Sequence, residues 1–441
     1  MRVLHVPYTY APDPLGGTEV YVTGLVHALH TLGISGLIAA PGRTAGRAVY
    51  EGIPVRRVAV SPTLSTNDLY GDGDPVAAHG FSALLEEERP DLLHLHALTP
   101  AVSLRLVREA ARRRIPTVLT YHTPTVTCQR GTLLRWGAEV CDGRLDLDFC
   151  TRCTLHGLGV PRPLADLAGR VPVAVGRAIG VARLNGLGWT ALRLRGLMTT
   201  RLAATRSVLA EVTHLVAVCQ WARDLLVRNE VPPAKITLCR HGIPRAEAPA
   251  PAPTPAPPGS SLRVTWLGRF DHTKGAHLLM EALRARPALP LALDLYGVPQ
   301  GPGGNRYAEH LRAKAGDDLR IRFQAAFPAE DAVARLQAYD MVAIPSQCLE
   351  TGPQVILEAF AAGVPVVGSR LGGIAELVTE GVDGLLVEPP GSVAAWEAVL
   401  ARLCDDRALV ARLRAGITPV RTMADVATEM AALYRRLKPT A

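Results

Sequence analysis

The sequence predicts an α/β protein with two domains, each built around a doubly wound parallel sheet. The 441 residues are too many for one ordinary domain and suit two of about 200 residues each. Short apolar runs typical of buried strands alternate with helical patterns in both halves, which favours parallel sheets. A proline-rich segment separates the two series. These observations predict two Rossmann-like domains joined by one linker.

The first series gives an N-terminal domain over residues 1–245. Its expected strands are Arg2–Pro7, Gly36–Ala40, Asp91–His94, Thr117–Tyr121, His214–Cys219 and Lys235–Cys239. Its expected helices are Thr18–Leu32, Ala101–Arg114 and Trp221–Asn229. The alternation breaks over about residues 125–212, where we expect a cysteine-rich and basic insertion.

The second series begins after the linker. Residues 246–261 (AEAPAPAPTPAPPGSS) have no core-forming side chains and predict an extended segment. Residues 262–441 form the C-terminal domain, which ends in a helix expected over Met423–Leu437. Because such sheets bind ligands at the carboxyl ends of their strands, we expect the two sheets to face across a ligand-binding cleft.

Residues 346–360 (SQCLETGPQVILEAF) carry the most specific functional signal. Gly352 and Pro353 stand where a helix is expected to begin, because proline is tolerated in a first turn. The free N–H groups of that turn and the helix dipole form an anion site. We therefore assign Thr351, Gly352 and Pro353 to the binding of a phosphate-bearing donor.

Two carboxylates flank this anion site. Glu358 lies about one turn into the helix, where a carboxylate close to a phosphate is useful as an acceptor for the hydroxyls of a ribose. Glu350 lies on the loop before the helix and is expected to face the group beyond the phosphates. The spacing therefore predicts a nucleotide-sugar held by one carboxylate at each end.

Residues 266–275 (WLGRFDHTKG) add two cations to this site. A strand-like run ends in Gly268, and Arg269 and Lys274 follow before the next helix. Arginine suits bidentate contact with a diphosphate, and lysine acts as a point charge. These cations can stabilise a leaving phosphate without a metal ion, so we expect no cofactor to be required for catalysis.

The glycine-terminated strand with Arg269 and Lys274, followed by Glu350, seven residues and Glu358, resembles the signature of retaining glycosyltransferases of family 4 (glycosyl transferases group 1). The resemblance covers both halves of the chain and implies the GT-B fold. It implies transfer of a sugar from a nucleoside-diphosphate sugar to a hydroxyl acceptor, with retention, in polysaccharide or cell-envelope glycan assembly. It also implies that Glu350 holds sugar hydroxyls as a catalytic residue.

The resemblance assigns roles in the N-terminal domain as well. It places the loop with Gly16 and Gly17 opposite the donor phosphates, and His122 beside the sugar and its anomeric carbon. It also implies that the last helix packs back on the first domain. His94 and His96 could be a metal pair, but no third ligand is evident, so we expect them to support the cleft wall.

Other functions are compatible with the same fold. A sugar-nucleotide 2-epimerase would convert the donor without an acceptor, and a non-catalytic nucleotide-sugar-binding subunit would only bind it. A phosphorylase of the pyridoxal type needs a cofactor lysine, and the chain has only four lysines.

Four cysteines lie close together in the insertion: Cys128, Cys141, Cys150 and Cys153. Their thiolates are candidate ligands of a structural zinc ion, because the last two have Cys-x-x-Cys spacing. Disulfides and free thiols are the alternatives. Asp146 and Asp148 have the acid-x-acid sequence pattern of a metal-chelating pair. They lie in this loop and not after a nucleotide-binding strand, so we interpret their match to that pattern as coincidence.

The charge of the chain is unevenly distributed. The net charge is +8, yet residues 105–206 hold seventeen arginines and six acidic residues. Residues 167–210 mix seven arginines with apolar residues and contain no acidic residue, a pattern compatible with an anionic membrane surface or with an ordinary solvated helix face. We expect a lipid-linked or soluble saccharide acceptor and no nucleic-acid partner. No secretory signal or membrane-spanning stretch is visible, so we expect a cytoplasmic protein, peripheral at the inner membrane face if the membrane interpretation holds.

Overall fold

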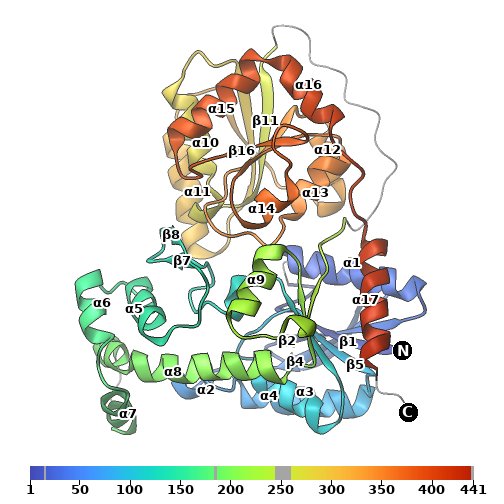
Figure 1. Cartoon of the computed structure of the whole chain (residues 1–441), viewed down its shortest axis with the longest axis vertical. Helices are drawn as coiled ribbons and strands as arrows, with labels where there is room; N and C mark the ends of the chain where they lie inside the picture. Colours follow the sequence, from blue (N-terminus) through green and yellow to red (C-terminus); the bar gives the residue numbers. More distant parts are fainter. Residues whose placement is uncertain (14–15, 183–185, 244–259, 439–441) are drawn as a thin grey trace. The chain divides into compact units, whose positions relative to one another are not determined.

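The structure is a computed structural model that describes residues 1–13, 16–182, 186–243 and 260–438 (Figure 1). It divides into two compact units. Unit 1 comprises Met1–Arg240 and Met423–Ala441, and unit 2 comprises His241–Thr422. Each unit contains one large, mainly parallel sheet with helices on its faces, so the prediction of two Rossmann-like domains is confirmed. Most of the expected linker at 246–261 lies outside the described residues.

The large sheet of unit 1 has eight strands: β1 (Arg2–Val6), β2 (Ser35–Gly42), β3 (Gly46–Tyr50), β4 (Ile53–Ala59), β5 (Leu92–Leu95), β6 (Thr117–Tyr121), β9 (His214–Ala217) and β10 (Ile236–Leu238). Their order is β10-β9-β6-β5-β1-β2-β4-β3. All neighbours pair in parallel except β3, which is antiparallel to β4 at the sheet edge. The central strands β5, β6 and β9 are buried along their whole length, as expected for a sheet covered on both faces.

The six strands expected in this unit are confirmed to within a few residues, but the β3–β4 hairpin was not predicted. Its turn residues Glu51 and Gly52 both have positive φ, at 48° and 78°. Two such residues match the twist of a hairpin. The usual asparagine or aspartate is absent here, so the sequence offered a weak turn signal.

The helices of unit 1 outside the insertion are α1 (Gly17–Thr31), α2 (Thr66–Tyr70), α3 (Pro75–Glu88), α4 (Leu104–Arg112), α9 (Gln220–Arg228) and α17 (Met423–Leu437). The last of these comes from the C-terminus of the chain and packs against α1 (Figure 1). Its Met430 and Tyr434 are fully buried in the same core as Tyr21 and Leu25 of α1. The prediction that the last helix packs back on the first domain is therefore confirmed.

Between β6 and β9 the chain leaves the sheet. This segment forms the small hairpin β7 (Leu134–Arg135) and β8 (Glu139–Val140), and then α5 (Leu147–Gly157), α6 (Arg162–Ala168), α7 (Val173–Val181) and α8 (Leu187–Glu211). The 25-residue α8 carries the chain back to β9. No helix in the described parts of the chain is long and apolar enough to cross a membrane.

Unit 2 has a six-stranded sheet that is parallel throughout: β11 (Leu262–Arg269), β12 (Leu291–Val298), β13 (Ile321–Gln324), β14 (Met341–Ile344), β15 (Val366–Ser369) and β16 (Gly384–Val387). The strand order is β13-β12-β11-β14-β15-β16. Its helices are α10 (Ala276–Ala285), α11 (Gly301–Ala315), α12 (Ala332–Leu336), α13 (Gln354–Ala361), α14 (Gly372–Leu377), α15 (Val393–Asp405) and α16 (Arg407–Ala415). The direction in which successive strands are added to the sheet reverses between β11 and β14. The ends of these neighbouring strands therefore lie at a topological switch point.

Candidate active site

The site predicted in the second half of the chain is built on the carboxyl ends of β11 and β14. Strand β14 ends at Ile344, and α13 begins at Gln354 with Pro353 as its N-cap. The Gly-Pro pair therefore directly precedes the helix, as predicted. Arg269 is the last residue of β11, and Lys274 closes a short 3₁₀ turn before α10. The fold thus brings the two sequence motifs to one edge of one sheet.

Lys274 and Glu350 contact each other directly. Lys274 Nζ lies 2.5 Å from Glu350 Oε1, and the same oxygen accepts a hydrogen bond from Ser346 Oγ at 2.8 Å. Burial alone would raise the pKa of Glu350, but the positive charge of Lys274, the bonds from Lys274 and Ser346, and the charge of Arg269 together lower it. The carboxylate is therefore ionised near neutral pH, and it holds Lys274 in place.

Two glycines allow the chain segments around this pair to approach so closely. Gly275 has a φ of +73°, and a Cβ atom at this position would lie 1.9 Å from the carbonyl oxygen of Pro345. A Cβ atom on Gly373 would lie 2.7 Å from the carbonyl oxygen of Glu350, to which the Gly373 N–H donates a hydrogen bond at 2.7 Å. Any larger residue would push apart the segments that carry Lys274 and Glu350.

Arg269 lies at the exposed end of β11. Its Nη1 donates to the side-chain amide oxygen Oε1 of Gln300 at 3.2 Å. Its charge nevertheless reaches Glu350, whose pKa it helps to lower. A guanidinium exposed at the carboxyl end of a parallel strand is available to an anionic ligand.

Glu358 lies on α13, and its side chain makes no hydrogen bond or ion pair with the described residues. Burial raises its pKa to about 7. A buried carboxyl group without hydrogen bonds from the protein binds the hydroxyl groups of a ligand well, because these supply the missing hydrogen bonds. This position agrees with the predicted role of Glu358 as an acceptor of ligand hydroxyls, but it does not test that role.

The loop before α13 is fixed by a histidine that the sequence did not suggest. His241 Nδ1 donates a hydrogen bond to the carbonyl oxygen of Gly352 at 3.1 Å. Burial lowers the pKa of His241 to about 4, so the ring stays neutral at physiological pH. Gly352 has a φ of +134°, and Thr351 beside it is half-buried.

In unit 1, the glycine pair begins α1 as expected. Gly16 is the N-cap and Gly17 the first helical residue. The Gly16 N–H, however, donates to Glu19 Oε2 at 2.9 Å in a capping box, and burial raises the pKa of Glu19. A phosphate at this turn would therefore compete with Glu19 for that N–H, while the remaining N–H groups of the first turn stay candidates.

His122 ends a chain of buried imidazoles. His96 Nδ1 lies 3.1 Å from His122 Nε2, and His96 Nε2 lies 3.1 Å from His5 Nδ1. The fourth ring, His94, bonds to Tyr434 Oη at 2.6 Å and to Thr120 Oγ1 at 2.7 Å. Burial lowers the pKa of His5 to about 3, and it also lowers the pKa values of His94 and His96, so these three rings are neutral at physiological pH.

The chain supplies the third imidazole that sequence reasoning did not find. Candidate ligand nitrogens of His5, His94 and His96 lie within 4.8 Å of one another, the one such group among the described residues. Both nitrogens of His94 and of His96 already have hydrogen-bond partners, so a metal ion would have to displace those bonds. The arrangement fits a hydrogen-bonded chain that orients His122 better than a metal centre.

The clustered cysteines divide into two sets. Burial raises the pKa of the Cys150 thiol to about 12, with further contributions from Cys128 and Cys141, so these three sulfurs lie within electrostatic range of each other. Cys153 instead accepts a hydrogen bond from the Trp136 N–H at 3.4 Å. No disulfide joins any of the eight cysteines in the structure. A single zinc ion would require Cys153 to leave this bond, so zinc stays a prediction.

The acidic pair in the same loop has structural roles. Asp146 caps α5 by accepting from the Phe149 N–H at 2.6 Å, and Asp148 Oδ1 lies 2.5 Å from Arg195 Nη1. These bonds agree with the interpretation that the acid-x-acid spelling is coincidental.

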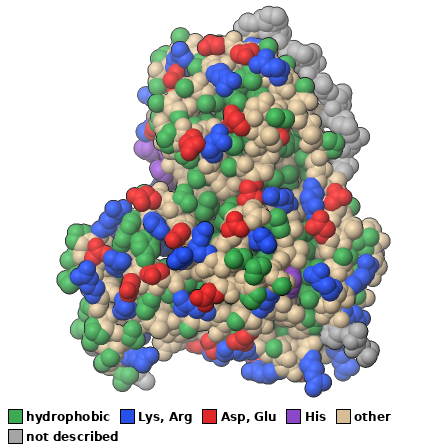
Figure 2. Space-filling model, in the orientation of Figure 1, with side chains coloured by type: hydrophobic (Ala, Val, Ile, Leu, Met, Phe, Trp, Pro, Cys, Tyr) green, Lys and Arg blue, Asp and Glu red, His purple; other side chains and the backbone are tan. Residues whose placement is uncertain are grey.

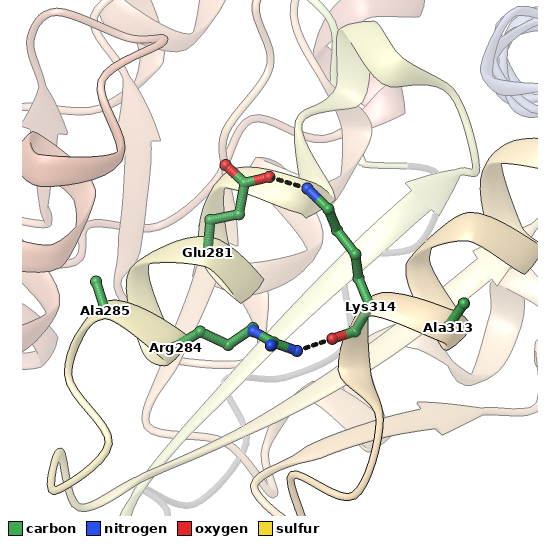
Figure 3. A pocket seen from close by; sticks show the side chains of 5 residues that line it. All are labelled: Glu281, Arg284, Ala285, Ala313 and Lys314. Atoms are coloured by element: carbon green, nitrogen blue, oxygen red, sulfur yellow. Dashed lines mark hydrogen bonds and ion pairs between the residues drawn. The ribbon is translucent and has the colours of Figure 1, made fainter.

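A surface hollow in unit 2 lies away from these residues. It runs between α10 and α11 and is lined by Glu281, Arg284, Ala285, Ala313 and Lys314 (Figure 3). Glu281 and Lys314 form an ion pair of 2.6 Å across it. None of the predicted site residues lines it, so we assign it no part in the site and use its ion pair below as a control.

Comparisons with known proteins agree with this division of the chain. Residues 16–242 match the family model described as "Glycosyl transferase 4-like domain", and residues 255–417 match "Glycosyl transferases group 1". The first model spans half of the chain and covers most of unit 1. The second covers Arg269, Lys274, Glu350 and Glu358.

Among curated relatives, the chain is 36% identical over 155 residues to the D-inositol 3-phosphate glycosyltransferase of Corynebacterium urealyticum, covering 34% of this chain and 36% of that protein. It is 32% identical over 237 residues to the enzyme of that name from Salinispora arenicola, covering 49% of this chain and 52% of the relative. The matched segments therefore span from about a third to about half of these relatives.

Solved structures extend the likeness to the whole fold. Anabaena Alr3699/HepE in complex with UDP and glucose covers 99% of this chain and all of its own, with 17% identity and a TM-score of 0.62. Sucrose-phosphate synthase from Thermosynechococcus elongatus covers 99% of both chains, with 18% identity and a TM-score of 0.65. At these identities the comparison establishes the fold, which is the two-domain GT-B fold.

Proposed function

The chain belongs to the glycosyl transferase 4-like family, and we propose that it transfers a sugar from a nucleoside-diphosphate sugar to a hydroxyl acceptor. The observation that carries this proposal is the Lys274–Glu350 ion pair, with Arg269 beside it, at the carboxyl ends of β11 and β14. This edge offers two cations and one ionised carboxylate where a doubly wound sheet binds its ligand. The HepE complexes with UDP-glucose support a nucleotide-sugar as the donor.

We assign one part of the donor to each group. The diphosphate binds Arg269, Lys274 and the start of α13, because these supply positive charge and N–H donors. Glu350 accepts hydrogen bonds from hydroxyls of the sugar, and Glu358 from those of the ribose. In the absence of a donor, Glu350 neutralises Lys274, and a diphosphate would take over that role.

The proposed reaction breaks the bond between the anomeric carbon and the β-phosphate oxygen, and the electron pair stays on that oxygen. Arg269 and Lys274 stabilise the developing charge, an effect that typically contributes several kcal/mol to catalysis. The acceptor oxygen bonds to the anomeric carbon from the same face, and its proton passes to the departing phosphate. Among the described residues we identify no covalent nucleophile, which favours this route over a double displacement.

For unit 1 we propose the acceptor side of the reaction. His122, held by the His96–His5 chain, is our candidate for contact with the transferred sugar, and the turn at Gly16 and Gly17 is our candidate for contact with donor phosphates. The acceptor is a lipid-linked or soluble saccharide of polysaccharide or cell-envelope glycan assembly in the cytoplasm. Arg269 and Lys274 provide the countercharge, so we expect no cofactor to be required.

The experiment that tests this proposal begins with thermal unfolding of the purified chain in a panel of nucleotide-sugars. A donor that stabilises the protein is then incubated with saccharide acceptors, and the product is examined by NMR. Transfer with an unchanged anomeric configuration supports the proposal. Conversion of the donor in the absence of an acceptor would instead identify a 2-epimerase, and binding without any conversion would identify a non-catalytic subunit.

A further inference from the structure

Helix α7 is apolar on all sides and yet largely exposed. Its sequence VAVGRAIGV contains one charged residue, Arg177, and only Gly176 and Ile179 of its nine residues are buried. A helix that is apolar all round is normally covered by protein or lipid. The described parts of the chain do not supply that cover, so α7 is expected to have an external partner.

The neighbouring segments share this property. Of the sixteen large hydrophobic side chains that are exposed in the described chain, six lie within residues 158–189. These six are Leu158, Leu164, Leu167, Val175, Val181 and Trp189. Val181 is 85% exposed and Leu167 is 68% exposed, so they are not covered by side chains of their own unit. A concentration of this kind marks an interaction surface, whereas single exposed side chains do not.

The charges around these side chains are almost all positive. Residues 158–182 contain three arginines and one acidic residue, Asp166, which pairs with Arg152 at 3.2 Å. The side chains of Arg170 and Arg177 are exposed and have no hydrogen bond or ion pair among the described residues. In Figure 2, hydrophobic and basic side chains lie side by side over the part of unit 1 formed by these helices, with acidic side chains between some of them.

Helices α6 and α7, which carry most of these exposed side chains, are held by contacts with α8. Gly176 and Gly180 pack closely on Arg193 of α8, where an added Cβ atom would lie 3.2 Å and 3.1 Å from Arg193 atoms. Arg195 Nη1 donates to the carbonyl oxygen of Gly169 at 3.0 Å, which ties α8 to the end of α6. The apolar side chains of α6 and α7 are therefore held on a packed framework and not on a loose excursion.

We infer that α6, α7 and the start of α8, which we call the insertion face, dock on a bilayer containing anionic phospholipids. Apolar side chains flanked by arginines suit shallow burial between headgroups, with the guanidinium groups at the phosphates. A second copy of this chain fits less well, because a self-complementary contact would bring the same unpaired arginines together. The inference does not rest on transferase activity.

Co-sedimentation of the full chain with vesicles tests this inference. We expect binding to vesicles of phosphatidylglycerol and phosphatidylcholine at low salt, loss of binding in high salt, and no binding to phosphatidylcholine alone. The double variant Arg170→Gln/Arg177→Gln should bind about 25-fold more weakly, because each arginine near an anionic surface contributes about fivefold. Leu167→Asp/Val181→Asp should weaken binding by at least as much.

Matched variants elsewhere on unit 1 serve as controls. Val49 of β3 is 71% exposed, and Arg43 is exposed, so Val49→Asp and Arg43→Gln should bind like the wild type. Vesicle binding should also shift the tryptophan emission to shorter wavelength, and Trp189→Phe should abolish that shift. These substitutions are on the surface, and circular dichroism confirms that each variant is folded.

Three results would overturn the inference. The first is no sedimentation with phosphatidylglycerol vesicles even at low salt. The second is equal binding by the wild type and the insertion-face variants, which would move the contact elsewhere. The third is a concentration-dependent dimer that Leu167→Asp/Val181→Asp converts to a monomer, which would identify a second copy as the occupant.

Discussion

The two units place very different polar groups at comparable positions of their sheets. In unit 2, the ends of β11 and β14 carry opposite charges that pair with each other, and Lys274 remains 23% exposed. In unit 1, the ends of β1, β5 and β6 carry His5, His94, His96 and His122, which form a buried cluster with depressed pKa values for the first three. The edge of unit 2 carries charged side chains, whereas His5, His94 and His96 of unit 1 are neutral and are held by hydrogen bonds.

Under the proposed function, this difference corresponds to two separate tasks of the reaction. A leaving phosphate requires positive charge in place before the bond breaks, because reorienting solvent would add to the barrier. Uncharged donors and acceptors suffice to orient a sugar, and burying a charge for that purpose would be costly. The comparison therefore predicts that removal of a charged side chain lowers turnover most when the side chain is in unit 2. It also predicts that acid lowers the stability of unit 1 most.

The largest effect is expected from Lys274→Ala. Loss of one charged donor at a developing phosphate should lower turnover by about a hundredfold or more, and Arg269→Ala should act in the same way. The measurement is kcat with the donor found in the panel. Lys314→Ala is the matched control, since Lys314 also pairs with a glutamate of unit 2, at 2.6 Å, away from the site. Normal turnover in both site variants would contradict the assignment of charge to this edge.

The next effect concerns acid and unit 1. Burial holds the pKa of His5 at about 3 and lowers that of His96, whereas unfolded histidines titrate near 6.5. Below pH 6.5 the unfolded chain therefore binds more protons, so stability falls as the pH falls. One such histidine contributes about 2 kcal/mol to the loss between pH 8 and pH 5. His96→Leu should reduce the loss by that amount.

Hydrogen exchange of β1 and β5 amides at pH 5 and pH 8 measures this loss within unit 1. His96→Leu is expected to be less stable at both pH values, because it removes the hydrogen bonds of His96 to His5 and His122, so the comparison concerns only the difference. The exposed His79 provides the control His79→Leu. An unchanged pH difference in His96→Leu would show that His96 does not stay neutral in the folded protein.

A smaller effect is expected at Glu358. Burial raises its pKa from 4.5 to about 7, so the folded protein retains a proton that the unfolded chain releases, and stability falls as the pH rises from about 4.5 to about 7. Ribose hydroxyls favour the ionised carboxylate as acceptor. The affinity for a nucleoside diphosphate should therefore rise by up to about tenfold between about pH 6 and pH 8.

Calorimetric titrations with UDP, ADP and GDP at the two pH values test this expectation. Glu358→Gln should bind more weakly at pH 8 and lose the pH dependence, whereas the exposed control Glu330→Gln should behave like the wild type. Glu350→Ala should instead lower turnover with little change in nucleotide affinity. Matching kinetic and binding profiles for Glu350→Ala and Glu358→Gln would argue against separate roles for the two ends of the donor.

The smallest effect is expected from a chelator. Activity should persist when EDTA is added during the assay, because Arg269 and Lys274 act where a metal ion would otherwise act. Long incubation could still destabilise the insertion if Cys128, Cys141 and Cys150 hold zinc. Metal analysis of the untreated protein decides between zinc and free thiols. An immediate loss of activity that magnesium or manganese restores would overturn the metal-independent mechanism.

The sequence by itself determined six strands of unit 1 and the residues of the candidate donor site. Periodicity located the buried strands, because strands covered on both faces leave continuous apolar runs. Charged residues beside glycines at the strand and helix ends located Arg269, Lys274 and Glu350, because a phosphate-bearing ligand favours close backbone approach, N–H groups and charge. The sequence did not predict the β3–β4 hairpin, because its Glu51–Gly52 turn lacks the usual residues. It also did not identify Ser346, His241 and Gln300 as contacts of the site residues, because no local motif marks them.

Only the tertiary structure decided which distant residues meet. Lys274 and Glu350 are 76 positions apart and form one ion pair, and His94 meets Tyr434 across 340 positions because α17 returns to unit 1. His5 meets His96 because β1 pairs with β5, so spacing arguments could not reveal the imidazole chain. The sequence also did not decide whether α7 is exposed, because an apolar helix has the same sequence pattern in a core and on a surface. Contacts between distant segments follow from strand order and helix packing, and a linear pattern does not contain them.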